Sequence, residues 1–135
     1  MAIQFSILTR NAFLDALETY AGTSAVLKIR TGAAPADCDT ADAGTVLATL
    51  SLPSDWMAAA ANGSKAKAGT WEDASADAAG TAAHWRLYKS DGTTCVAQGT
   101  ITATGGGGDL TLVNTNIAVG QPITITSFTL TAPGA

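Results

Sequence analysis

The chain has 135 residues, a formal net charge of −4 and only 13% charged residues, about half the ~25% usual in soluble proteins. This length suits one domain with a hydrophobic core, and the acidic balance excludes a basic surface for nucleic acid. No apolar run approaches the ~18 residues of a membrane span, and MAIQFSILTRNAF lacks the pattern of a signal peptide. We therefore expect a protein without membrane contact that stays in the cytosol of the producing cell until lysis or another particle carries it out.

The first predicted element is a helix within NAFLDALETYAG. Thr9 or Asn11 can cap its start, and Gly22 lies where a residue of positive φ commonly ends a helix. Apolar residues at helical spacing predict a stripe packed on the domain, with Asp15 and Glu18 facing water. The stripe comprises Phe13, Leu14, Leu17, Tyr20 and Ala21.

After Gly22 the apolar period changes from 3.6 to 2, which indicates strands. SAVLKIRT alternates Ala25, Leu27 and Ile29 with more polar positions, AAPADCDTADAG has the composition of a loop, and TVLATLSL resembles the first strand. PSDWMAAAANGS fits a single helical turn or a short helix that ends at Asn62-Gly63. KAKAGTWED predicts a strand with its two lysines, Lys65 and Lys67, on the solvent side.

Asp91-Gly92 is a strong signal of a β-hairpin with a two-residue type I′ turn. This turn would pair Tyr88 with Cys95 and Leu87 with Val96, and side chains alternate across each strand. The face assigned to the core holds Trp85, Leu87 and Val96, and the opposite face holds His84, Arg86, Tyr88 and Cys95.

The rest of the chain continues as short strands and turns: GTITAT, the glycine loop 105–108, DLTLVN and the closing PITITSFTLTAP. A bulge near Ser127 would bring Ile123, Ile125, Phe128 and Leu130 to one face. About seven or eight strands and one helix predict a single mostly β domain over residues 1–135. We expect an antiparallel β-sandwich of jelly-roll type, with an N-terminal strand and helix segment over about residues 1–22.

The stretch HWRLYKSDGTTC concentrates side chains that enzymes use. A nucleophile and its base must lie within hydrogen-bond reach of each other. In the predicted register His84 pairs near Gly99, about four residues along the ladder from Cys95, and the chain has no second histidine. We therefore expect no catalytic residues, and interpret the stretch as the polar face of a sheet.

Three further patterns are weak matches to ligand sites. Asp37, Asp39 and Asp42 share a loop with Gly44, but their spacing departs from a calcium loop. One histidine and two separated cysteines are too few for zinc, and the GGGG loop lacks the Lys-Ser/Thr of a phosphate loop. We expect no metal and no cofactor.

The two glutamates, Glu18 and Glu72, do not form the pair of carboxylates that a glycosidase needs.

The tryptophans and the cysteines leave two questions open. Trp56 and Trp71 could line a sugar-binding groove, whereas core packing explains Trp85. Reduced thiols are the default for Cys38 and Cys95, but the two could form a disulfide after release if they lie close together.

Three long segments carry a family resemblance: LKIRTGAAPADCDTADAGTVLATLSLPSDWM, GSKAKAGTWEDASADAAGTAAHWRLYKSDGTTCVAQGTI and DLTLVNTNIAVGQPITITSFTLTAPGA. In this order they cover nearly the whole chain from about residue 24, and they resemble a family of small virion proteins from tailed bacteriophages. Some members look like capsid cement or decoration proteins with a jelly-roll or β-sandwich fold. These bind outside the shell and brace neighbouring capsomers.

The resemblance implies a non-enzymatic protein on the capsid exterior, made in the host cytoplasm, with the major capsid protein as partner and a homo-oligomeric state on the particle. The alternative is a tail- or fibre-associated receptor or carbohydrate-binding module, with Trp56 and Trp71 as stacking platforms. MAIQFSIL could exchange with the capsid or a sister subunit, or form the first strand of the protein's own sheet. The low content of charged residues fits a surface that is buried in an assembly. An ordinary threonine-rich β domain would have the same low charge, so composition favours neither interpretation.

Overall fold

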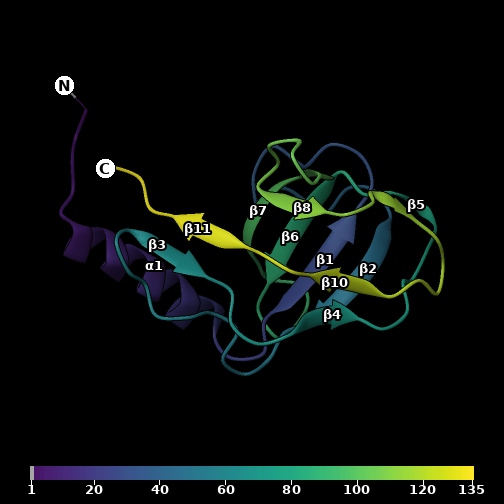
Figure 1. The fold of residues 1–135 in the computed structure, drawn as a ribbon, viewed down its shortest axis with the longest axis horizontal. Coiled ribbons are helices and arrows are strands. Elements are labelled where there is room, and N and C mark those ends of the chain that lie inside the picture. Colours follow the sequence, from purple (N-terminus) through teal and green to yellow (C-terminus); the bar gives the residue numbers. More distant parts are fainter. Residues whose placement is uncertain (1) are drawn as a thin grey trace.

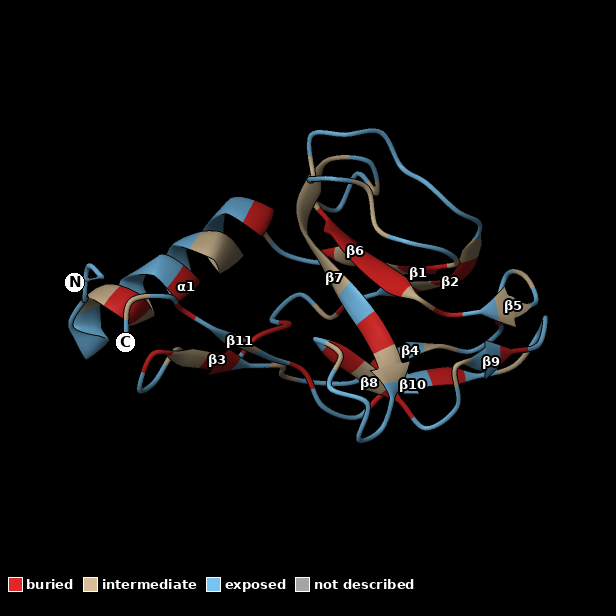
Figure 2. Ribbon diagram, turned by 90° about the horizontal axis from the view of Figure 1, so that it is seen from above, coloured by how far each residue is buried: buried red, intermediate tan, exposed pale blue. Residues whose placement is uncertain are grey.

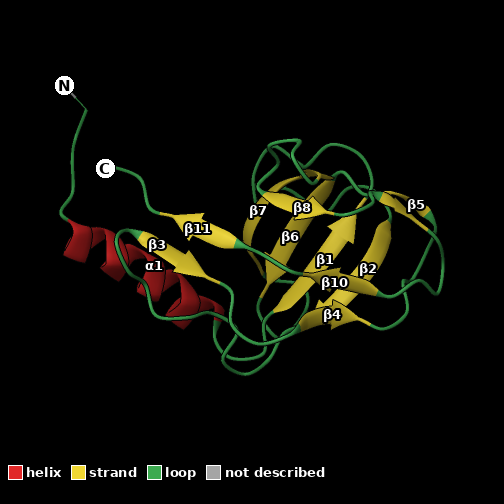
Figure 3. Ribbon diagram, in the orientation of Figure 1, coloured by secondary structure: helices red, strands yellow, loops and turns green. Residues whose placement is uncertain are grey.

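The computed structural model describes residues 2–135, which form eleven strands and one helix. The main sheet has five strands in the spatial order β2 (Val46–Ser51), β1 (Val26–Arg30), β6 (His84–Tyr88), β7 (Cys95–Ala103) and β8 (Leu110–Leu112). Neighbouring strands are antiparallel except β7 and β8, which run parallel. The predicted mostly β fold with one short helix is confirmed (Figure 3).

Short strand pairs form a second layer across one face of this sheet, and β7 runs from one layer toward the other (Figure 2). The pairs are β4 (Trp71–Asp73) with β10 (Ile123–Ile125), and β5 (Gly80–Thr81) with β9 (Asn116–Ile117). The hydrophobic core lies between the layers and includes Leu27, Ile29, Trp71 and Ile125. Leu27 and Ile29 are fully buried, as the alternation in their strand predicts.

A helical arm, α1 (Ile7–Ala21) with β3 (Ser64–Ala66) and β11 (Thr129–Thr131), extends from one end of the two layers (Figure 1). Ser6 caps α1, because its Oγ accepts a hydrogen bond from the Thr9 N–H at 3.2 Å. The predicted start at Thr9 or Asn11 is therefore wrong, and α1 begins several residues earlier. Gly22 ends the helix with φ of +79°, as predicted. No helix in residues 2–135 combines the length and apolar character needed to span a bilayer.

The buried face of α1 differs from the predicted stripe. Leu14 and Ala21 are buried, but Phe13 and Tyr20 are 42% and 58% exposed. The packed face instead carries Arg10, whose guanidinium donates to the carbonyl of Ala132 at 3.0 Å. The helix packs on β3, which carries a lysine, and lies beside the backbone carbonyl of Ala132.

That lysine is Lys65, which is only 2% exposed. Its Nζ lies 2.7 Å from Asp15 Oδ1 and 2.6 Å from Glu18 Oε2. Burial alone would lower the pKa of Lys65, but the hydrogen bonds from the two carboxylates outweigh it and raise the pKa. The prediction that Lys65 lies on a solvent side is therefore wrong, and Glu18 is only 25% exposed, whereas Asp15 is 55% exposed and faces water as predicted. Pairing of β3 with β11 places Lys65 beneath α1.

The predicted short helix at 53–64 is absent. Trp56 is fully buried, and its Nε1–H donates to the carbonyl of Gly22 at 2.8 Å. Asn62 and Gly63 have φ of +53° and +75° and join Ala61 to Ser64 through two backbone hydrogen bonds. This is the geometry of a type I′ turn, so Asn-Gly marks a hairpin here and not a helix end.

The hairpin between β6 and β7 confirms the predicted pairing of Tyr88 with Cys95. A bulge between Leu87 and Tyr88 then shifts the register, so that Leu87 pairs with Ala97 and not with Val96. Of the two turn residues only Gly92 has positive φ, which excludes the predicted type I′ turn. Asp91 instead accepts hydrogen bonds from the side chain and backbone of Thr94, which lower the pKa of Asp91 to about 2.

The closing stretch breaks into two strands, because β10 pairs with β4 and β11 pairs with β3. Ile123, Ile125 and Phe128 are buried and Leu130 packs against the same core. All four therefore meet the core as predicted, but through an interruption of the strand at 126–128. Residues 2–5 form no strand, so the described part of MAIQFSIL is not the first strand of the sheet; Met1 lies outside the described residues.

Candidate functional site

A loop of residues 32–44, the strap, leaves the end of β1 and crosses the face of the main sheet opposite the second layer (Figure 2). It covers the polar side chains of β6, so that His84 and Tyr88 are fully buried and Arg86 is 2% exposed. These side chains do form the predicted polar face of a sheet, but the strap covers that face. β6 is a central strand, and its neighbours on both faces bury all five of its residues.

Arg86 is the main point of attachment for the strap. Its Nε–H donates to Gln98 Oε1 at 2.9 Å on β7, beneath the strap. Its Nη2 donates to two strap carbonyls, those of Asp37 at 2.8 Å and Thr40 at 2.9 Å. Its Nη1 lies 2.5 Å from Asp42 Oδ1. A buried guanidinium with this set of partners holds a segment of backbone in place and has little capacity left for a ligand.

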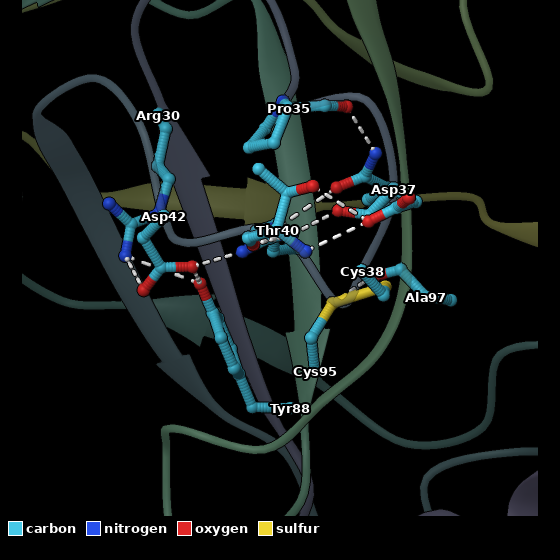
Figure 4. Close-up of a disulfide and its surroundings, with 11 residues drawn as sticks. Arg30, Pro35, Asp37, Cys38, Thr40, Asp42, Tyr88, Cys95 and Ala97 are labelled. Atoms are coloured by element: carbon cyan, nitrogen blue, oxygen red, sulfur yellow. Dashed lines mark hydrogen bonds and ion pairs between the residues drawn. A yellow bond between two sulfur atoms is a disulfide. The ribbon is translucent and has the colours of Figure 1, made fainter.

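Asp42 is the carboxylate that balances this buried charge (Figure 4). Besides Arg86, it accepts hydrogen bonds from Arg30 Nη2 at 2.9 Å and from the Tyr88 hydroxyl at 2.7 Å. Partial burial raises the pKa of Asp42, but the hydrogen bonds from Tyr88 and Arg86 and the charge of Arg30 outweigh it, so the net pKa is lowered. Burial and the bond to Asp42 raise the pKa of Tyr88.

Cys38 in the strap and Cys95 at the start of β7 form a disulfide, with their Cα atoms 5.4 Å apart (Figure 4). The two residues are 57 positions apart in the chain. The sequence left this pairing open, and the structure shows that the fold brings the two cysteines together. Neither sulfur is a free thiolate, which is the form that acts as a nucleophile.

His84 lies at the other end of the same face, four positions along β6 from the partner of Cys95. Its Nδ1 is 2.7 Å from the carbonyl of Gly32, so the imidazole holds the start of the strap. It pairs with Thr100, one residue from the predicted Gly99. The structure therefore does not bring His84 and Cys95 together.

The other two aspartates of the strap are Asp37, which is hydrogen-bonded within the loop, and Asp39, which is exposed. Asp37 accepts hydrogen bonds from the hydroxyl and the N–H of Thr40, both at 2.8 Å, and these lower its pKa. Asp39 is exposed, and Gly44 has φ of +74° and no room for a side chain beside Thr31. Within residues 2–135 no three His, Cys, Asp or Glu side chains gather as metal donors.

Trp56 and Trp71 are both fully buried, so neither can present a flat face to a sugar. The Trp71 Nε1–H donates to the carbonyl of Ala68 at 3.1 Å, and its ring packs on Phe128 with centroids 5.3 Å apart. The prediction that these tryptophans are stacking platforms is wrong. Glycines 105–108 form the turn between β7 and β8.

Two open hollows mark the surface, of about 320 and 370 Å³. The first is lined by residues from 112–114 and 121–126 and contains no ionisable side chain. The second includes Asp109, whose carboxylate accepts a hydrogen bond from the Thr100 N–H at 2.9 Å. Neither hollow therefore holds a pair of acid and base groups.

Comparison with known proteins gave no matching family model, no matching curated protein and no matching solved structure. The strap is held against the sheet by a disulfide and by buried hydrogen bonds and ion pairs. This arrangement stabilises a surface loop.

The lowered pKa of Asp42 predicts loss of stability in acid. A carboxylate whose folded pKa lies below its unfolded value stabilises the fold above the unfolded pKa, and this contribution falls as pH drops through the folded pKa. The stability difference between wild type and Asp42→Asn should be constant above about pH 5 and should shrink below about pH 4. Urea unfolding across this range measures it, and parallel curves for the two proteins down to about pH 2 would contradict the assignment.

Proposed function

We propose that this protein is a non-enzymatic structural component of a tailed-phage virion, a capsid cement or decoration protein that braces neighbouring capsid subunits. It is made in the host cytoplasm and mounted on the capsid exterior as a homo-oligomer. Three segments that resemble such proteins support this proposal, as does a two-layered β fold that we interpret as an abbreviated jelly-roll-like sandwich. A binding role of this kind needs a rigid body and attachment surfaces, and no catalytic pocket.

The observation that carries the proposal is the apolar surface of the helical arm. Ile3, Ile7 and Leu8 are 75%, 53% and 79% exposed, and Phe5 and Phe13 beside them are 38% and 42% exposed. No charged side chain precedes Arg10, whose guanidinium is turned inward. A group of large exposed apolar side chains marks an interaction surface in a folded protein.

The N-terminal segment is held in place for such a contact. The Phe5 N–H donates to the carbonyl of Gly134 at 2.7 Å, and the Phe5 ring packs edge-on against Phe13 with centroids 5.1 Å apart. A segment that is already ordered loses less conformational entropy when it binds. We propose that this surface contacts the major capsid protein, and that many copies on one particle add modest contacts by avidity.

Binding to purified capsids that lack the protein tests this proposal. Wild type should co-sediment in many copies and raise the temperature at which the shells break. The double variant Ile3→Ser/Leu8→Ser should bind at least about 100-fold more weakly, because burial of each side chain contributes about 1.5–3 kcal/mol. Val113→Ser, at an exposed valine on the β layers, is the matched control and should bind normally.

Copy number separates this role from a position on the tail or fibre. Electron microscopy of whole virions should show the protein distributed over the capsid. A few copies at the tail tip would overturn the cement role and leave the virion role standing. Absence from the particle would overturn both.

A further inference from the structure

We propose that the Cys38–Cys95 disulfide is a redox latch: oxidation closes the strap on the sheet, and reduction lets the strap open while the two β layers stay folded. The proposal rests on the geometry of the strap and is independent of the proposed virion role. It predicts a local change in one loop, whereas a purely structural disulfide would change the stability of the whole domain.

The strap contributes no buried side chain to the core. Every residue from 32 to 44 is exposed or half-buried, and apart from the disulfide the strap is joined to the sheet by hydrogen bonds and by the ion pairs of Asp42. A single hydrogen bond contributes little net free energy to folding, because water replaces it when it breaks. Opening also separates Asp42 from Arg30 and Arg86, and without a covalent bond only these contacts and the hydrogen bonds oppose it.

The position of the disulfide suits a latch. Cys38 lies at the midpoint of the strap, and Cys95 belongs to the main sheet. Glycines with φ of +75° and +74°, Gly32 and Gly44, stand at the two ends of the strap. Below them Thr31 and Thr45 are joined by hydrogen bonds of 3.1 and 2.9 Å, so the base of the loop is fastened independently. The segment between the glycines can therefore swing outward without disturbing β1 or β2.

The chemistry is a two-electron thiol–disulfide exchange. One cysteine thiolate attacks oxidised glutathione and forms a mixed disulfide, which releases one glutathione thiolate. The second cysteine thiolate attacks the protein sulfur of that mixed disulfide, which forms Cys38–Cys95 and releases the second glutathione. The two protein thiols lose two electrons and two protons, and one oxidised glutathione becomes two reduced molecules. Cys38 and Cys95 are both half-exposed, so a small thiol can reach them.

Opening would uncover a basic face. Asp42 moves with the strap, whereas Arg30 and Arg86 stay on β1 and β6, where they are 6% and 2% exposed in the closed state. The redox state of one bond would thus decide whether two guanidinium groups are paired inside the protein or open to solvent. The disulfide keeps Asp42 close to Arg30 and Arg86, which raises the effective concentration of its carboxylate beside them. This favours the closed state.

Native-state hydrogen exchange with and without a non-thiol reductant tests the latch. Reduction should speed exchange of the Thr40 amide, the strap N–H that donates to Asp37, by about tenfold or more and leave the amides of β1 unchanged, and oxidised glutathione should restore slow exchange. An endoproteinase that cleaves at aspartate should cut the strap only in the reduced protein. Cys38→Ser/Cys95→Ser should behave as the reduced protein under every condition.

Two results would overturn the latch. Strap exchange that is the same in both redox states would show that polar contacts alone keep the loop closed. A rise in exchange that includes β1 would show that the disulfide stabilises the domain as a whole. Cys38→Ala with the Cys95 thiol intact gives a second variant if the double serine variant fails to fold.

Discussion

Replacement of Asp42 by alanine is expected to lower the free energy of unfolding by about 2–3 kcal/mol at pH 7. The variant would leave the buried guanidinium groups of Arg30 and Arg86 without a carboxylate. Loss of one partner from a buried ion pair typically costs about 3–5 kcal/mol. We expect the lower figure because the Asp42 side chain is 38% exposed, so water can enter and solvate part of the charge. Urea unfolding monitored by tryptophan fluorescence measures the change.

Asp39→Ala is the matched control for this prediction. Asp39 lies in the same strap and carries the same charge, but its side chain is exposed. We expect its unfolding free energy to stay within about 0.5 kcal/mol of wild type, as for most surface substitutions. Equal effects of the two alanine variants would show that net charge, and not the contacts of Asp42, stabilises this region.

Replacement of Trp71 by alanine should have the largest effect of any single change, about 3–5 kcal/mol. The side chain is fully buried between Trp56 and Phe128, with ring centroids 6.1 and 5.3 Å from theirs. It also ties two loops together, because its Nε1–H donates to the carbonyls of Ala68 and Trp56. Truncation would leave a cavity and remove the Trp71 donor from the carbonyl of Ala68, whereas the Trp56 carbonyl keeps its hydrogen bond from the Ala68 N–H at 2.9 Å. The midpoint of thermal unfolding should fall by about 10 °C or more.

Phe13→Ala controls for the loss of an aromatic ring. Phe13 is 42% exposed on the helical arm, outside the main core. Its removal should shift the unfolding midpoint by only a few degrees. A Trp71→Ala protein with a wild-type midpoint would contradict the position of Trp71 at the centre of the core.

Local patterns predicted the elements whose environment is set by their own residues. The alternation of Leu27 and Ile29 identified β1 and its buried face, and Gly22 marked the end of α1. The turn at Asp91-Gly92 correctly paired Tyr88 with Cys95. These predictions held because a pleat, a positive φ and a tight turn depend on neighbours within a few residues.

Local patterns failed where a distant segment changed the environment. Glu18 and Asp15 occupy positions that normally face water, until β3 brings a lysine against them. Composition predicts the strap as a loop, but the alternation in HWRLY does not show that its polar face is covered. A possible signal was the richness of that face in groups that need partners: a buried Arg86 and Tyr88 require a cover that supplies acceptors.

The sequence by itself determined that the protein is mostly β, which stretches alternate, and where the chain turns, because these follow from short-range sterics and hydrophobic period. Only the tertiary structure decided that Cys38 meets Cys95 and that Asp42 lies between two arginines. It alone decided that Trp56 and Trp71 are core and not surface. The physical reason is that burial and charge pairing depend on contacts between residues far apart in the chain, and these exist only once the strap, the sheet and the helical arm have packed together.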